Sequence, residues 1–148
     1  MSFYFCVLII IMLIDVERGL ILNKVVYPSA AIALIIAAIT SEPGIISVLI
    51  GGGLGLVVML LVALISKGAI GWGDVKMSGL VGLFTGFPMV LISLLLAVVS
   101  GGLVAVTLLL LKLKERKQTI PFGPFLSLGA MLTLLWGADI LNWYLRLF

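Results

Sequence analysis

The stretch GIISVLIGGGLGLVVMLLVALI, residues 44–65, decides the fold class of this chain. It contains no charged side chain and consists mostly of Leu, Ile, Val and Gly. A helix rises about 1.5 Å per residue, so about 20 apolar residues cross the hydrocarbon core of a bilayer. We therefore expect this stretch to form a transmembrane helix.

The composition of the whole chain extends this expectation. Hydrophobic residues make up 64% of the 148 residues and charged residues 10%, and the mean hydropathy is +1.42. A soluble domain has roughly 45–50% apolar and about 25% charged residues. We therefore predict an all-α, polytopic membrane protein, with residues 1–148 forming a single membrane-embedded domain.

Scarce residue types exclude several chemistries. The chain has no histidine and one cysteine, Cys6. Catalysis by a Ser-His pair, histidine metal ligands and an internal disulfide are therefore excluded. The formal charge of +3 is interpreted as a topology signal and not as a nucleic-acid surface. We predict no metal, no cofactor and no nucleic-acid partner.

The remaining apolar segments complete a six-helix prediction. The six segments are Phe3–Ile14, Val25–Thr40, Gly44–Ile65, about Val75–Phe84, Met89–Leu111 and Phe125–Leu145. The first and fourth are short for a span, and each adjoins an aspartate, Asp15 and Asp74. A carboxylate is therefore expected within the membrane or at its edge in both helices.

The distribution of basic residues predicts the topology. With six spans, the connections at 15–24, 66–76 and 112–119 share one side and hold eight of the nine Lys and Arg residues. The positive-inside rule makes that side cytoplasmic and places both termini on the other side. Asp15 and Asp74 then share the cytoplasmic face. Asp139 falls near the opposite end of the last helix, and we interpret it as structural.

Two groups of glycines within apolar segments have a simpler interpretation. Gly51 and Gly55 are four residues apart, and Gly101 and Gly102 are adjacent. Small residues let membrane helices approach each other closely. We expect these glycines to serve helix packing.

Two acids on one face of a membrane protein are compatible with three chemistries. They can bind a cation, relay protons through a transporter, or activate water as in aspartic proteases. Gly71 and Gly73 precede Asp74 and would let a substrate backbone come close. A plain structural alternative is that Asp74 caps a helix, or is stabilised by the helix dipole, at the start of the fourth segment.

Local motifs carry a resemblance to a known family. Gly71-Trp72-Gly73-Asp74, followed by Lys76, resembles the G-x-G-D-x-K signature of type IV prepilin peptidases, which are membrane aspartic proteases. Asp15, with Ile21-Leu22-Asn23 downstream, is similar to the first aspartate of that family. The run Ile120–Ala130 resembles a late P-F-G-P-F-L motif of the family. The resemblance implies Asp15 and Asp74 as the catalytic pair, and as motif-supporting or substrate-binding residues Gly71, Gly73, Lys76, Pro121, Phe122, Gly123 and Pro124.

The resemblance also implies an activity and a location. Such peptidases cut the leader from prepilins or pseudopilins at the cytoplasmic face of a prokaryotic cytoplasmic membrane, and we expect the substrate's apolar helix to enter from the bilayer. Leu22 stands where many members have proline, and the sequence has no Cys-x-x-Cys pair. We therefore expect a short, peptidase-only form, or a trimmed one, without methyltransferase activity or zinc.

Three alternatives remain open from the sequence. The same aspartates would suit a small proton- or cation-coupled transporter, although they lie at one face instead of mid-helix. A non-catalytic scaffold for pilus or secretion machinery would not need them. A presenilin-type intramembrane protease also uses G-x-G-D, but usually has tyrosine before its first aspartate, where this chain has Ile14.

Overall fold

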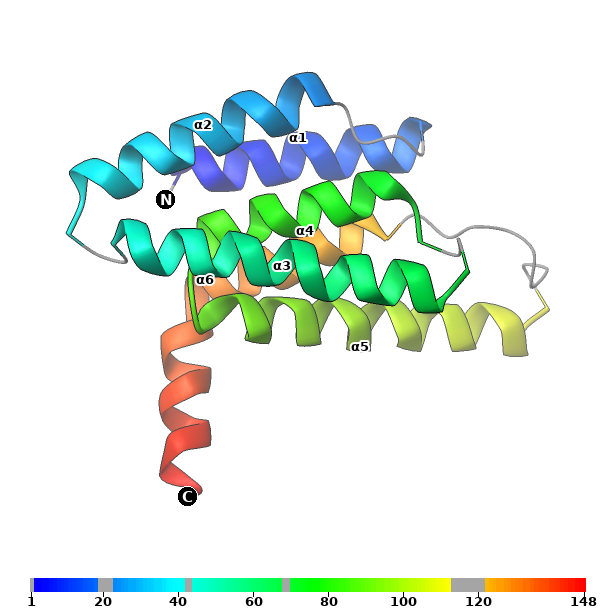
Figure 1. The fold of residues 1–148 in the computed structure, drawn as a ribbon. Helices are drawn as coiled ribbons and strands as arrows, with labels where there is room; N and C mark the ends of the chain where they lie inside the picture. Colours follow the sequence, from blue (N-terminus) through cyan, green and yellow to red (C-terminus); the bar gives the residue numbers. More distant parts are fainter. Residues whose placement is uncertain (1, 19–22, 42–43, 68–69, 113–121) are drawn as a thin grey trace.

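The helices of this chain run in alternating directions. A computed structural model describes residues 2–18, 23–41, 44–67, 70–112 and 122–148, and within these ranges every regular element is a helix. They are α1 (Ser2–Arg18), α2 (Asn23–Ile39), α3 (Ile45–Ile65), α4 (Trp72–Thr85), α5 (Met89–Leu110) and α6 (Gly123–Arg146). Figure 1 shows that α1, α3 and α5 end at the same end of the bundle at which α2, α4 and α6 begin. The all-α prediction is confirmed.

Helix length and surface chemistry agree with a membrane protein. By length and composition, α3, α5 and α6 can each cross a bilayer, while α2 is apolar but has 17 residues. Large apolar side chains such as Leu49, Leu61, Leu95 and Leu103 are exposed on the outside of the bundle. A surface of this kind suits contact with lipid. That all six helices span the membrane stays a prediction.

Two helix boundaries differ from the sequence expectation, and both involve the aspartates. α1 continues to Arg18, so Asp15 lies in its last turn and not beyond its end. α4 begins at Trp72, so Gly71 is the N-cap and Asp74 lies in the first turn. The N-cap interpretation of Asp74 is therefore wrong. The reason is that an apolar run marks the part of a helix that lies in hydrocarbon, whereas polar residues can extend the same helix beyond it.

The short helix α4 forms the centre of the bundle. Ten of its 14 residues are buried, and it contacts α2, α3, α5 and α6. A Cβ on Gly51 of α3 would lie 2.5 Å from Gly82 O, and a Cβ on Gly55 would lie 2.9 Å from the carbonyl carbon of Ser78. Ser78 Oγ also donates to Gly55 O at 2.9 Å. The prediction that the α3 glycines serve helix packing is confirmed at these two positions.

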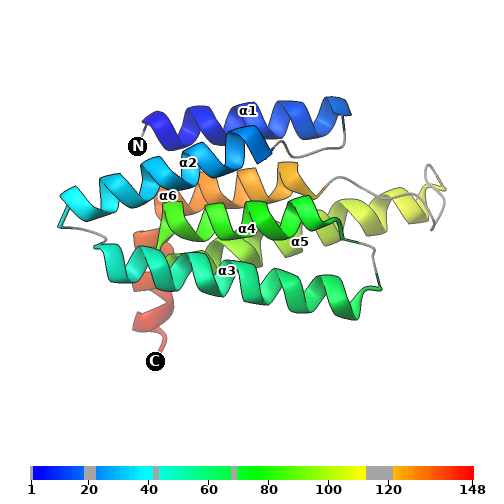
Figure 2. The ribbon, with the colours of Figure 1, turned by 45° about the horizontal axis from the view of Figure 1, so that its top comes forward.

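α6 changes direction along its length. Figures 1 and 2 show its first part running with the bundle and its C-terminal part turning away from it. Thr133 Oγ1 donates to the carbonyl four residues earlier at 2.8 Å, and Gly137 follows one turn later. Both features favour bending of a helix. The last apolar segment is therefore one helix but not one straight rod, and the exposed Asp139 lies in its C-terminal part.

Candidate active site

The structure brings Asp15 and Asp74 together. Both lie at the end of the bundle where α1 ends and α4 begins (Figure 1). Their side chains are buried, with 3% and 9% of their surface exposed. The two carboxyl groups lie within range of electrostatic interaction with each other. Burying two acids beside each other is unfavourable and is typical of functional positions in membrane proteins.

The surroundings of Asp74 come from its own helix start. The Asp74 backbone amide donates to Gly71 O at 3.1 Å. Gly71 is extended, with φ −73° and ψ 154°, and no side chain caps the helix. A Cβ on Gly71 would lie 3.9 Å from Asp74 Oδ2, which is ordinary contact. An acid in a first helical turn is stabilised by the positive end of the helix dipole.

The surroundings of Asp15 come from a distant part of the chain. Its carboxyl group lies against Gly123, the first residue of α6, and a Cβ on Gly123 would lie 2.8 Å from Asp15 Cγ. The Gly123 backbone amide faces this carboxyl. Among the residues that the structure describes, Asp15 Oδ2 is buried without a hydrogen-bond partner. Sequence reasoning included Gly123 in a motif but missed its contact with the acid, and the only signal was the motif itself.

Phe122 and Pro124, which belong to the same Pro-Phe-Gly-Pro motif as Gly123, also lie at the start of α6. Phe122 is the N-cap residue of α6, and Pro124 lies in its first turn, where proline is favoured. The side chain of Phe122 packs near Gly101 of α5. Pro121 lies outside the described residues. The structure therefore places three of the four motif residues at the helix start that adjoins Asp15.

Lys76 is directed away from the aspartates. Its Nζ donates to Asn23 Oδ1 of α2 at 3.3 Å and lies 5.8 Å from the centre of the Tyr27 ring. Successive residues of a helix are about 100° apart, so positions 74 and 76 point to nearly opposite sides of α4. The contacts of Lys76 therefore join α4 to α2 and give no support to a role in tuning the acids.

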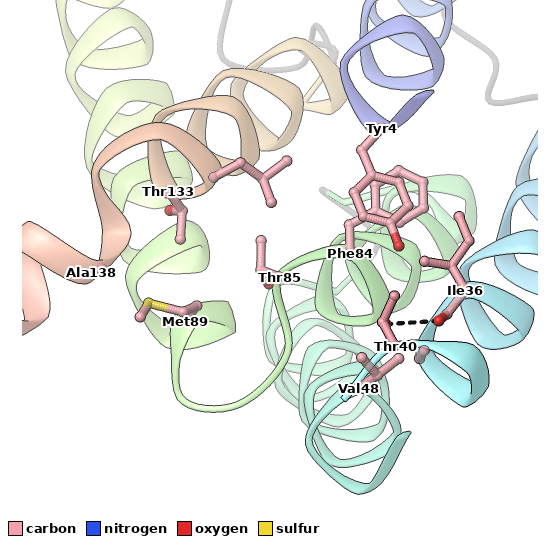
Figure 3. Close-up of a pocket in the computed structure, with 11 residues that line it drawn as sticks. Tyr4, Ile36, Thr40, Val48, Phe84, Thr85, Met89, Thr133 and Ala138 are labelled. Atoms are coloured by element: carbon pink, nitrogen blue, oxygen red, sulfur yellow. Dashed lines mark hydrogen bonds between the residues drawn. The ribbon is translucent and has the colours of Figure 1, made fainter. Parts of the chain in front are cut away.

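A cavity at the other end of the bundle is separate from this site. It has a volume of about 370 Å³ and is lined by residues that include Tyr4, Phe84, Thr85 and Thr133 (Figure 3). The hydroxyl groups of Thr85 and Thr133 donate to carbonyls of their own helices at 2.9 and 2.8 Å. The lining contains no carboxyl group. Within the described part of the chain, no three His, Cys, Asp or Glu residues gather into a possible metal site.

Comparison with known proteins gives matches along most of the chain. Residues 2–106 match the family described as the Type IV leader peptidase family, and this range includes Asp15 and Asp74. The prepilin leader peptidase/N-methyltransferase of Bacillus subtilis (strain 168) is 26% identical over 147 residues, which are 97% of this chain and 58% of that protein. The protein of the same name from Pseudomonas putida is 30% identical over 138 residues, 90% of this chain and 48% of that protein.

A third relative matches a shorter region with higher identity. The prepilin leader peptidase/N-methyltransferase of Aeromonas hydrophila is 36% identical over 85 residues, which are 57% of this chain and 29% of that protein. The chain thus matches between 29% and 58% of the length of these relatives. No solved structure matches. Because the family match covers well over half of its residues, the chain belongs to the type IV leader peptidase family.

Proposed function

We propose that this chain is a membrane aspartic endopeptidase that removes leader peptides from type IV prepilins or pseudopilins. The observation that carries the proposal is the pairing of two buried acids, Asp15 and Asp74, from different helices of a leader peptidase family member. Relatives are named prepilin leader peptidase/N-methyltransferase. Methyltransferase activity is not part of the proposal, because the two acids supply a means of hydrolysis only.

The two carboxyl groups divide the proposed reaction between them. One, ionised, takes a proton from a water molecule, whose oxygen attacks the carbonyl carbon of the scissile peptide bond. The other, protonated, donates a hydrogen bond to the carbonyl oxygen and stabilises the tetrahedral intermediate. Breaking the C–N bond then requires a proton on the leaving amine, which the acid pair supplies. Neighbouring carboxyl groups suit this chemistry because they do not readily ionise together.

The proposed topology follows the charge distribution. All six helices span the cytoplasmic membrane of a prokaryote, and the end that carries Asp15 and Asp74 faces the cytoplasm, since the basic connections lie there. The apolar helix of the substrate enters laterally from the bilayer, with its leader at the cytoplasmic side. Gly71 and Gly73 leave room for the substrate backbone beside Asp74.

Co-expression with a prepilin, followed by mass spectrometry of the mature N-terminus, tests the proposal. We expect cleavage by the wild-type chain, and a loss of about 100-fold or more for Asp15→Asn and for Asp74→Asn. Asp139→Asn is the matched control and should cleave normally, because Asp139 is exposed and lies in the C-terminal part of α6. Full cleavage by either of the first two variants would refute the assigned roles. Proton or cation uptake in liposomes without cleavage would support the transporter alternative.

A further inference from the structure

The Asp15 carboxyl lies in close contact with Gly123, which has no side chain to displace it. A Cβ on Gly123 would overlap Asp15 Oδ2 and would lie 3.3 Å from Asp15 Cβ. Gly123 is itself buried, and it opens α6 without any side-chain cap. The first amides of a helix have no partner within the helix, so they are available to an acid at this position. The orientation of Asp15 therefore depends on where the first turn of α6 lies.

The first turn of α6 packs against α5 at Gly101. A Cβ on Gly101 would lie 2.8 Å from Phe122 Cε2, 3.2 Å from Phe122 Cδ2 and 3.3 Å from Phe125 Cδ2. The Phe122 and Phe125 rings are 6.2 Å apart, and both cover this glycine. A Cβ on the adjacent Gly102 would meet nothing within 4 Å. Of two neighbouring glycines, one is required by the start of α6 and the other is not.

We propose that Gly101 and Phe122 are positioning residues for Asp15. The ring of Phe122, packed on Gly101, fixes the first turn of α6, and Gly123 in that turn fixes the carboxyl group. In this role Gly101 and Phe122 act on Asp15 only through Gly123, which contacts its carboxyl group. The effect on catalysis rests on the proposed peptidase function. If Asp15 is catalytic, a displacement of its carboxyl group by about 1 Å can lower the rate about 100-fold.

The first test compares two adjacent substitutions, Gly101→Ala and Gly102→Ala, in the purified full chain with a prepilin substrate. For Gly101→Ala we expect kcat to fall about 10-fold or more and KM to stay within about twofold, because the acid is misplaced while substrate binding remains. Gly102→Ala should leave both constants within about twofold. Thermal unfolding in the same detergent shows whether either variant is misfolded. Equal effects of the two substitutions would overturn the inference.

A second-site substitution tests whether Phe122 transmits the effect. In a Phe122→Leu background the shorter side chain gives room to the added methyl group. The further loss caused by Gly101→Ala should then shrink to about twofold or less, whereas independent effects would multiply. An undiminished loss in that background would show that Gly101 acts by another route.

A labelling experiment separates this inference from the proposed function. In a Cys6→Ser background, the thiol of an Asp15→Cys variant should react slowly with a water-soluble maleimide, because position 15 is buried. Adding Gly101→Ala should raise the rate several-fold, and adding Gly102→Ala should not. This result holds whether or not the wild-type chain cleaves prepilin. If the wild-type chain cleaves but Gly101→Ala changes neither kcat nor labelling, only the positioning inference fails.

Discussion

The two aspartates share one end of the bundle but are held there in different ways. Asp74 lies in the first turn of its own helix, and its nearest support is Gly71, three residues earlier. Asp15 lies in the last turn of α1, and its carboxyl lies on Gly123, more than 100 residues later in the chain. Asp74 thus has a local setting, made by residues next to it in the chain. Asp15 has a tertiary setting, made by a residue of another helix.

This difference matters for how each site tolerates change. Asp74 and Gly71 lie at the start of the same helix, so a shift of α4 moves both and keeps their contact. The contact between Asp15 and Gly123 joins α1 to α6, so it is lost when either helix moves relative to the other. We therefore expect Asp15 to be the more sensitive to packing and Asp74 the more sensitive to changes in the approach of the substrate.

The largest expected difference comes from lengthening each acid by one methylene group. Asp15→Glu should lower kcat about 100-fold, because the longer side chain would have to displace the start of α6. Asp74→Glu should lower kcat only about 10-fold, since exposed Gly71 borders the carboxyl with ordinary contact distances. Cleavage assays with purified variants of matched thermal stability measure both. Equal losses would contradict the distinction between the two settings.

The next effect concerns the helix pair that carries Asp74. Gly55→Ala would push a methyl group into the backbone of Ser78, one turn beyond Asp74 on α4. Overpacking of this kind costs typically about 1–3 kcal/mol of stability, and we expect a lower unfolding temperature in detergent. Gly53→Ala is the matched control on the same helix, because a Cβ there meets nothing within 4 Å. If Gly53→Ala is as destabilising, then helix propensity and not the close contact explains the result.

The same contrast explains how much of the site could be predicted from the sequence. Alternation of six apolar segments was enough to place Asp15 and Asp74 at one end and to separate Asp139 from them. The motif around Asp74 is contiguous, so its glycines could be recognised directly. The contact between Asp15 and Gly123 could not, because it depends on the depth at which α6 begins relative to α1. Neither apolar pattern nor charge fixes that depth to within a residue.

Helix boundaries and the shape of α6 were also beyond the sequence pattern. α1 runs past Asp15 because polar residues continue the helix after hydrophobicity ends. The bend in α6 lies inside one continuous apolar stretch, where Thr133 and Gly137 weaken the helix without interrupting it. Hydropathy reports transfer into lipid, and it is insensitive to the direction in which a helix then runs.

A smaller effect is expected at Gly71. A methyl group there would make only ordinary contact with Asp74, so Gly71→Ala should leave kcat within about twofold. If the glycine gives room to the substrate backbone, KM should rise several-fold. For Gly101→Ala we expect the opposite, a fall in kcat with little change in KM. Steady-state cleavage at varied prepilin concentration separates the two constants. A fall in kcat at constant KM would instead indicate that Asp74 is packed as tightly as Asp15.

The smallest effect is expected at Lys76, although it lies only two residues from Asp74 and belongs to the same motif. Its ammonium group contacts Asn23 and the Tyr27 ring on the far side of α4 from the acid. Lys76→Met keeps the length of the apolar stem and removes the charge, so cleavage should stay within about twofold of wild type. Asn23→Ala is the matched control, since it removes the partner while keeping the charge. If Lys76→Met loses activity as Asp74→Asn does and Asn23→Ala does not, the lysine must turn toward the acids during the reaction. The surroundings of Asp74 would then include the Lys76 ammonium group, which in this structure contacts Asn23 and Tyr27 instead.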